Sequence, residues 1–222
     1  MWNVWTAVAD LTLGRECAGC RAPGGLICLR CRGDLQPRPR LRRSIDVSDI
    51  VDGLRLPVAC SLDYRGSTRR VLYSYKDHRV RELARFLAPA LADSIRFVAQ
   101  RSNTRPSELI VVPMPTRRAN ARSRGFDHVS YLVSRSRAHA RWHSVASLLR
   151  DSRGPGSSKT LGARDRVEAS AGAFQVTGRV PRGPVVLVDD IVTTGATARE
   201  ASAALILAGV QVIAVATVAG TP

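Results

Sequence analysis

Residues 185 to 197 read Val-Val-Leu-Val-Asp-Asp-Ile-Val-Thr-Thr-Gly-Ala-Thr, and this stretch decides the fold. The apolar run Val185 to Val188 is typical of a strand buried on both faces, as in a parallel sheet covered by helices. A helix is expected over residues 196 to 208, so two acids and a hydroxyl-rich loop follow the strand directly. Open α/β sheets bind their ligands at the carboxyl ends of strands. The stretch therefore predicts an α/β fold with a binding site at this edge of the sheet.

The residue types in this stretch suit a phosphorylated sugar. Asp189 and Asp190 can hold two vicinal ribose hydroxyls. Gly195 allows close approach of the backbone, and the amides that open the following helix face an anion. Three threonine hydroxyls complete the cup for a phosphate, from Thr193, Thr194 and Thr197.

Three known kinds of motif fit this stretch less well. A buried strand that ends in acids also occurs in response regulators, but there the acidic pair follows the first strand, and here it lies near the C-terminus. A Walker loop needs Gly-Lys-Ser/Thr, and a dinucleotide fingerprint needs three spaced glycines. Neither pattern follows the strand.

Residues 189 to 197 resemble the phosphoribosyl pyrophosphate (PRPP) loop of the type I phosphoribosyltransferases: two acids, two variable residues, Thr-Thr-Gly, a variable residue and Thr. The resemblance implies displacement of pyrophosphate from C1′ of PRPP, assisted by Mg²⁺. It assigns Asp189 and Asp190 to the ribose and the metal. The 5′-phosphate is assigned to Thr193, Thr194, Gly195, Ala196 and Thr197.

Four cysteines near the N-terminus form two CxxC pairs, Cys17 with Cys20 and Cys28 with Cys31. Each pair supplies two sulfurs from one tight turn, and the short spacer brings the turns together, which predicts a closed, structural Zn²⁺ site. Two disulfides or four buried thiols are the alternatives. Disulfides need an oxidising compartment, whereas residues 1 to 13 lack the basic start of a signal peptide. We therefore expect zinc and a cytoplasmic location.

Composition limits the remaining possibilities. The chain has 222 residues, enough for one good core and a small appendage, and no segment has the apolar length for membrane insertion. Its net charge is +16, carried almost entirely by arginine. A biased genome composition explains arginine richness by itself, but such a charge still attracts polyanions, either substrate phosphates or nucleic acid.

The pattern of apolar residues and turn residues divides the chain into three parts. We expect an N-terminal helix and a four-cysteine zinc module over residues 1–36, a linker or strap over 37–56, and a phosphoribosyltransferase-like domain over 57–222 with a mostly parallel sheet flanked by helices. Cys60 falls in an apolar strand and is expected to be a small core residue. Expected helices cover 3–13, 67–76, 80–98 and 126–141; expected strands cover 58–64, 109–112 and 210–218, with a short extended piece at 174–176 and a loop over 150–160.

Both ends of the chain together resemble the ComF family, which joins a zinc ribbon to a phosphoribosyltransferase-like domain. The resemblance rests on Val111 to Pro115 followed by Thr116-Arg117-Arg118, on Arg122 to Asp127, on Tyr64-Arg65-Gly66 with Lys76, and on Asp165-Arg166 with Gly172-Ala173-Phe174. It implies that Thr116, Arg117 and Arg118 meet the pyrophosphate. Arg124 is the candidate to close over the site, and Lys76 is a candidate for the same diphosphate.

The chain also departs from the ComF pattern. Asp127 and His128 stand where the family usually has Asn-Gln, Ser158 where a Gln is common, and Ala169 where an Asn is usual. None of the four histidines shows ligand spacing or an evident partner, so we expect surface or core positions for His78, His128, His139 and His143.

Two functions from different classes remain open. The first is a phosphoribosyltransferase with an unidentified acceptor. The second, implied by the ComF resemblance, is a non-catalytic accessory of DNA uptake that binds single-stranded DNA and meets the uptake machinery. Arg65, Arg69 and Arg70 lie among Tyr64, Tyr73 and Tyr75, a mixture that suits phosphate contacts and base stacking. At helical spacing, however, Leu72 and Tyr75 are expected to face the core.

Overall fold

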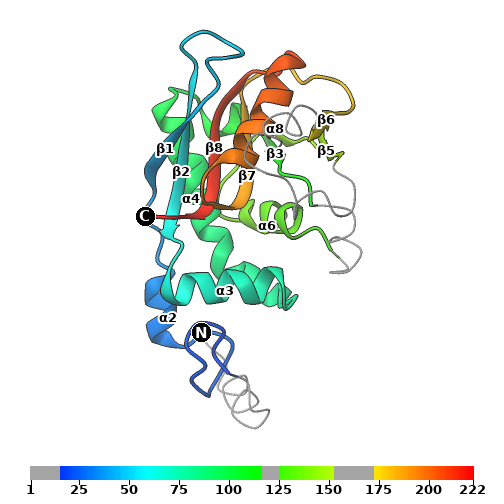
Figure 1. The fold of residues 1–222 in the computed structure, drawn as a ribbon. Helices are drawn as coiled ribbons and strands as arrows, with labels where there is room; N and C mark the ends of the chain where they lie inside the picture. The colour runs from blue at the N-terminus through cyan, green and yellow to red at the C-terminus, as the bar shows by residue number, and fades with distance from the viewer. Residues whose placement is uncertain (1–15, 117–125, 153–172) are drawn as a thin grey trace, which may run out of the picture.

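The computed structural model describes residues 16–116, 126–152 and 173–222, and these form an α/β fold around a six-stranded sheet (Figure 1). The strand order is β1-β2-β8-β7-β3-β4, and every neighbouring pair is parallel except β1 with β2. The expected fold class is confirmed. The strands are β1 (Arg40–Asp46), β2 (Arg55–Asp63), β3 (Ile110–Pro113), β4 (Ser144–Val145), β7 (Val185–Val192) and β8 (Val212–Gly220); β5 (Leu149–Asp151) and β6 (Phe174–Val176) form a separate antiparallel pair.

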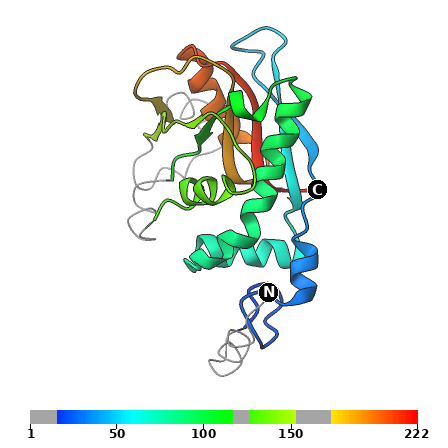
Figure 2. The same ribbon diagram turned by 180° about the vertical axis from the view of Figure 1, so that it is seen from behind.

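Helices cover both faces of the sheet. Helices α4 (Ala84–Arg101) and α6 (His128–Ser136) lie on one face, α8 (Ala196–Leu207) lies on the other, and α3 (Gly66–Lys76) runs across the end of the sheet next to α2 (Leu29–Asp34) (Figures 1 and 2). The short helices η1 (Arg81–Leu83) and η2 (Pro106–Glu108) complete the described set. The apolar stripe expected along residues 83 to 98 is buried throughout: Leu83, Leu87, Leu91, Ile95 and Val98. None of the described helices has the length and apolar character that crossing a bilayer requires.

Strand β7 is buried on both faces, which explains its unbroken apolar sequence. Val186 and Val188 pack with the cluster that contains α3, α4 and α6. Val185 and Leu187 pack with the cluster that contains α8. Because side chains alternate along a strand, the two acids that follow these valines turn toward opposite faces of the sheet.

The crossovers from β3 and β7 run in opposite directions. From β3 the chain passes through α6 to the edge strand β4, whereas from β7 it passes through α8 to β8. Strands β3 and β7 are neighbours in the sheet, so their carboxyl ends form a topological switch point. Open α/β sheets bind ligands in the crevice at such a point.

Several expected elements differ from the structure. Residues 37–56, expected as a linker or strap, contain strand β1, which pairs with β2. Only Ile45 of β1 is buried, because this is an edge strand, and the sequence therefore shows no apolar alternation. The helix expected over 126–141 covers only residues 128 to 136. The helix expected over 3–13 and most of the loop over 150–160 lie outside the described residues.

Candidate functional site

The four N-terminal cysteines lie together at the end of the molecule beyond α3. The Sγ atoms of Cys17, Cys20, Cys28 and Cys31 all lie within 4.8 Å of one another. Tetrahedral zinc with Zn–S bonds of about 2.3 Å places its sulfurs about 3.8 Å apart, and the Cys20 and Cys28 sulfurs are separated by 3.6 Å. All five cysteines of the chain are free thiols. The cluster therefore fits a structural metal and does not form the alternative pair of disulfides.

Backbone amides prepare the cluster for a thiolate. The amides of Gly19 and Cys28 donate to Cys17 Sγ at 3.4 and 3.3 Å, and the amide of Cys31 donates to Cys28 Sγ at 3.5 Å. Burial alone would raise the pKa of Cys17, but the backbone donors outweigh it and lower this pKa to about 7. Burial and the neighbouring sulfurs raise the pKa of Cys31. A bound cation would keep such crowded sulfurs ionised.

The cysteine module packs directly on α3. Cys17, Ile27, Cys31 and Leu35 belong to the same buried cluster as the apolar residues of α3. At Gly19 a Cβ atom would lie 2.6 Å from Cys31 Sγ, so only glycine fits there. The module is therefore built onto the sheet domain rather than joined to it by a free linker.

The loop of residues 193 to 197 joins β7 to α8 at the switch point. Gly195 has a φ of 83° and caps the helix, a conformation that favours glycine. Arg43 of β1 donates to the Thr194 carbonyl at 2.7 Å and to Thr221 Oγ1 at 3.2 Å, and Thr221 donates to the Thr193 carbonyl at 3.2 Å. Strand β1 and Thr221 thus fix the backbone carbonyls of the loop. Its exposed side presents the hydroxyls of Thr193 and Thr197.

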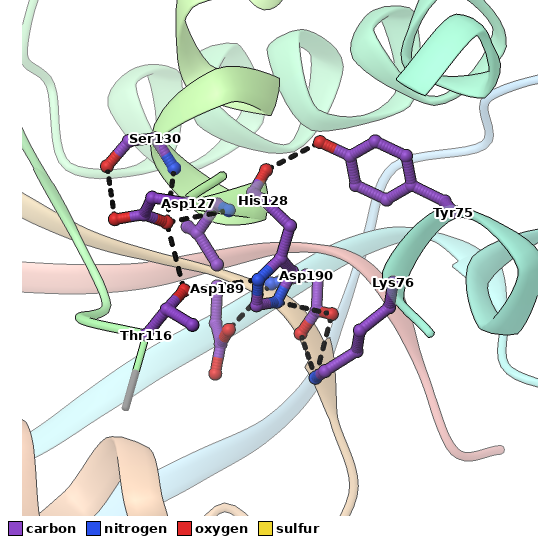
Figure 3. A network of polar contacts seen from close by, with 9 residues as sticks. Tyr75, Lys76, Thr116, Asp127, His128, Ser130, Asp189 and Asp190 are labelled. Carbon is purple, nitrogen blue, oxygen red and sulfur yellow. Dashed lines mark hydrogen bonds and ion pairs between the residues drawn. The ribbon is translucent and has the colours of Figure 1, made fainter. Parts of the chain in front are cut away.

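The two acids have different environments, as Figure 3 shows. Asp190 is buried, with 1% exposed area. Lys76 Nζ lies 2.9 Å from its Oδ2 and 3.3 Å from its Oδ1, and His128 Nε2 lies 3.2 Å from its Oδ2. Burial alone would raise the pKa of Asp190, but Lys76 and His128 outweigh it and hold this pKa below the usual range. Asp190 is therefore a charged, fully contacted carboxylate.

Asp189 points the other way and lines the cavity. One of its oxygens accepts the Asp190 backbone N–H at 2.8 Å. Burial and the neighbouring Asp190 charge raise the pKa of Asp189 well above the usual range. A raised pKa marks a carboxylate that gains from a cation or a hydroxyl donor.

A second group of polar contacts lies at the start of α6. Asp127 caps this helix by accepting from the amides of Val129 and Ser130 at 3.1 and 3.2 Å. Thr116, which follows β3, donates to Asp127 at 2.9 Å and lies 3.1 Å from His128 Nδ1. Tyr75 of α3 donates to the His128 carbonyl at 2.6 Å. Aspartate is among the residues that cap helices best, and here the Asp127 side chain fixes the start of α6.

These groups surround one cavity of about 330 Å³, a volume that suits a small ligand. Thr194, Gly195 and Ala196 line a smaller hollow that also borders Asp189 and Thr193. The predicted residues Arg117, Arg118 and Arg124 lie outside the described residues. The main cavity brings together six predicted residues, namely Lys76, Thr116, Asp189, Asp190, Thr193 and Thr197.

His128 is the site residue that the sequence did not reveal. The expectation that it takes a surface or core position is confirmed, since it is buried with 4% exposed area. The sequence showed no evident partner for it, and in the structure it contacts both Asp190 and Thr116. These partners lie on different elements, and only the fold brings them together. The one available signal was its departure from the ComF pattern.

A larger hollow, of about 520 Å³, lies between the cysteine module and the sheet. Arg38, Arg40 and Arg65 line it, together with Asp34 and Asp63. Asp63 forms ion pairs with Arg40 and Arg65, which reduces the local positive charge. On the neighbouring helix α3, Tyr73 is exposed, whereas Leu72 and Tyr75 are buried as expected.

No family model matches the chain. The chain is similar to DNA utilization protein YhgH of Salmonella typhi. The two sequences are 29% identical over 221 residues, which cover 96% of this chain and 88% of that protein. The similarity thus extends over both the cysteine module and the sheet domain.

Proposed function

We propose that this protein acts in DNA utilisation, as a ComF-type accessory that binds single-stranded DNA and can meet the DNA-uptake machinery. The observation that carries the proposal is the similarity to a DNA utilization protein over nearly the whole chain. The net charge of +16 supports it, because phosphate contacts supply most of the affinity for nucleic acid. Exposed arginines surround the cysteine module: Arg21, Arg30, Arg32, Arg38 and Arg69.

A DNA titration tests this proposal. Affinity for labelled oligothymidylate should be sequence-tolerant and should fall steeply between low and physiological salt. The double variant Arg38→Glu with Arg69→Glu should weaken binding at least tenfold. Arg101→Glu with Arg182→Glu makes the same change of charge on exposed residues away from the module and should weaken it less. Weak binding of the unmodified protein at low salt would remove DNA from its partners.

The cavity at the switch point favours a second candidate function, binding of PRPP and transfer of its phosphoribosyl group. The threonine loop and the amides of α8 would hold the 5′-phosphate, Asp189 would hold the ribose, and Thr116 and Lys76 would lie toward the diphosphate. Fixed donors of this kind stabilise a leaving diphosphate as charge develops on it. Asp190 is fully contacted, so Asp189 is the carboxylate suited to a ribose-bound Mg²⁺, which would neutralise the diphosphate.

Pyrophosphate release tests the second candidate. The protein is incubated with PRPP and Mg²⁺ and with each member of a panel of bases and amines as acceptors. Release that depends on one acceptor and is lost in Asp189→Asn would show transfer. Absence of release with every acceptor, in a protein that binds PRPP, would leave the cavity as a binding site only.

We also propose that the cysteine module binds one structural Zn²⁺. Four protein sulfurs leave no open coordination position, which is typical of structural rather than catalytic zinc. Because the module packs on α3, loss of the metal should also disturb the arginine surface that we propose for DNA.

A further inference from the structure

The two acids of the switch point are not equivalent as ligands for a sugar. Both oxygens of Asp190 lie within 3.3 Å of Lys76 Nζ, and its Oδ2 also lies 3.2 Å from His128. Only 2% of its side-chain area is exposed. Although Asp190 borders the cavity, its burial under Lys76 and His128 leaves almost none of the carboxylate open to a sugar hydroxyl. Asp190 is therefore a positioning residue that holds the end of β7 against α3 and α6.

Asp189 alone can receive a sugar hydroxyl. One of its oxygens is taken by the Asp190 amide. The side chain lines the cavity with Thr193 and Thr197. The pentose hydroxyls beside this loop therefore face one accessible carboxylate rather than two.

The number of carboxylates affects sugar selectivity. A hydrogen bond from a hydroxyl to a charged group contributes enough that its loss costs roughly tenfold or more in affinity. A site in which two free carboxylates read the 2- and 3-hydroxyls should therefore discriminate against 2-deoxyribose by at least that factor. Where only one carboxylate is accessible, the 3-hydroxyl, which both sugars carry, can satisfy that carboxylate.

We propose that this cavity binds 5-phosphorylated 2-deoxyribose, the sugar unit of DNA, about as well as the ribose equivalent. The proposal rests on the phosphorylated-pentose site of the proposed function and names its ligand class. It joins the two candidate functions, because a protein of DNA utilisation would meet deoxyribose phosphates. Tyr64, Met114 and Phe174 line the same cavity and offer an apolar wall for a base.

Calorimetry with ribose 5-phosphate and 2-deoxyribose 5-phosphate tests the proposal on the full-length protein. The two dissociation constants should agree within about threefold. Thr194→Val should weaken both sugars equally, since its hydroxyl is assigned to the phosphate they share. Ribose 5-phosphate binding tenfold tighter would overturn the inference but leave the pentose phosphate site intact. Binding of neither sugar, with DNA binding retained, would overturn the site and the inference together and leave the DNA proposal standing.

Two variants test the assigned roles of the acids. Asp189→Asn should weaken both sugars to the same extent, because it removes the negative charge that strengthens the hydrogen bond from the shared hydroxyl. Lys76→Gln should release Asp190 and raise the preference for ribose about threefold or more, a change in ratio that a general loss of folding would not produce. An unchanged ratio in Lys76→Gln would show that Lys76 does not withhold Asp190 from the sugar.

A third ligand identifies the source of the deoxyribose phosphate. If thymidine 5′-phosphate binds more tightly than 2-deoxyribose 5-phosphate, the apolar wall contacts the base. The ligand is then a nucleotide or the 5′ end of DNA. Equal affinity would support the free sugar phosphate. In the first case a 5′-phosphorylated oligothymidylate should compete for the site, and its 5′-hydroxyl counterpart should compete at least tenfold less well. If the protein bound neither thymidine 5′-phosphate nor 2-deoxyribose 5-phosphate, the proposal would be overturned.

Discussion

At the scale of single residues, Asp189 and Asp190 are neighbours in the chain with different tasks. Alternation along β7 sends one carboxylate into the cavity and the other toward α3 and α6. Lys76 and His128 surround the second acid and lower its pKa despite its burial. The loop motif by itself suggests two ligand-binding carboxylates, and the surroundings of each acid separate them into a binding residue and a positioning residue.

Asp190→Ala should cost about 3 kcal/mol in the free energy of unfolding, because it leaves the Lys76 ammonium and His128 without their shared acceptor. The folded pKa of Asp190 lies below its ordinary value of 3.8. The wild-type contribution is therefore complete above about pH 4 and is lost as the pH falls through the lower folded pKa. Urea unfolding of the wild type and of Asp190→Ala at pH 7 measures the loss of stability. The same comparison at pH 3 should give a smaller difference between the two proteins. Asp52→Ala, on the exposed turn before β2, is the control and should change the stability by less than about 0.5 kcal/mol.

At the scale of elements, strand β1 supports the loop of residues 193 to 197. Its sequence is rich in arginine and has one buried apolar residue, so it resembles a linker. In the fold it pairs with β2 and brings Arg43 to the carbonyl of Thr194. An edge strand can thus contribute to a site through its side chains while its sequence carries almost no strand signal.

Arg43→Gln should loosen the loop of residues 193 to 197 and weaken ribose 5-phosphate binding about fivefold or more, since loss of a charged hydrogen bond costs about 1.5 to 3 kcal/mol. Hydrogen exchange should show faster exchange of the loop amides, with the amides of β7 unchanged. Arg55→Gln removes an exposed arginine of the same hairpin, which pairs with Asp46, and should alter neither property. Unchanged loop exchange in Arg43→Gln would contradict the supporting role of β1.

At the scale of the whole molecule, the cysteine module and the sheet domain share one buried cluster through α3. The same helix ends at Lys76, which contacts Asp190 at the candidate site. Helix α3 therefore contacts both the cysteine module and the candidate site. A change in the module can reach the cavity most directly through α3, whereas the far face of the sheet has its own core.

Cys28→Ser should lose the metal, because a structural zinc site contributes folding energy only when its four ligands are intact. Residues 16 to 36 should lose protection from hydrogen exchange while β7 and β8 keep theirs. Elemental analysis should find one zinc per chain in the wild type and none in the variant. The buried thiol of Cys60 lies outside the cluster of four sulfurs, so Cys60→Ala should retain the metal. A wild-type protein purified without zinc would contradict the prediction.

Features that depend on neighbours along the chain can be predicted from the sequence alone. The strand, acids and loop of residues 185 to 197 are contiguous, and the two CxxC pairs bring their own sulfurs together in short turns. The apolar stripe over residues 83 to 98 likewise follows from helical periodicity. Each of these predictions needs only local geometry, and the structure confirms the strand, the stripe and the cysteine cluster.

Only the tertiary structure decided which distant residues meet. Lys76, His128 and Asp190 come from α3, α6 and β7, and Arg43 reaches the loop from a strand about 150 residues earlier in the chain. Contacts between separate elements depend on sheet order and on which face each helix covers. The local sequence around each contacting residue predicts neither. Because those contacts leave Asp189 as the accessible carboxylate, the sugar selectivity that we propose would depend on the fold rather than on the local motif.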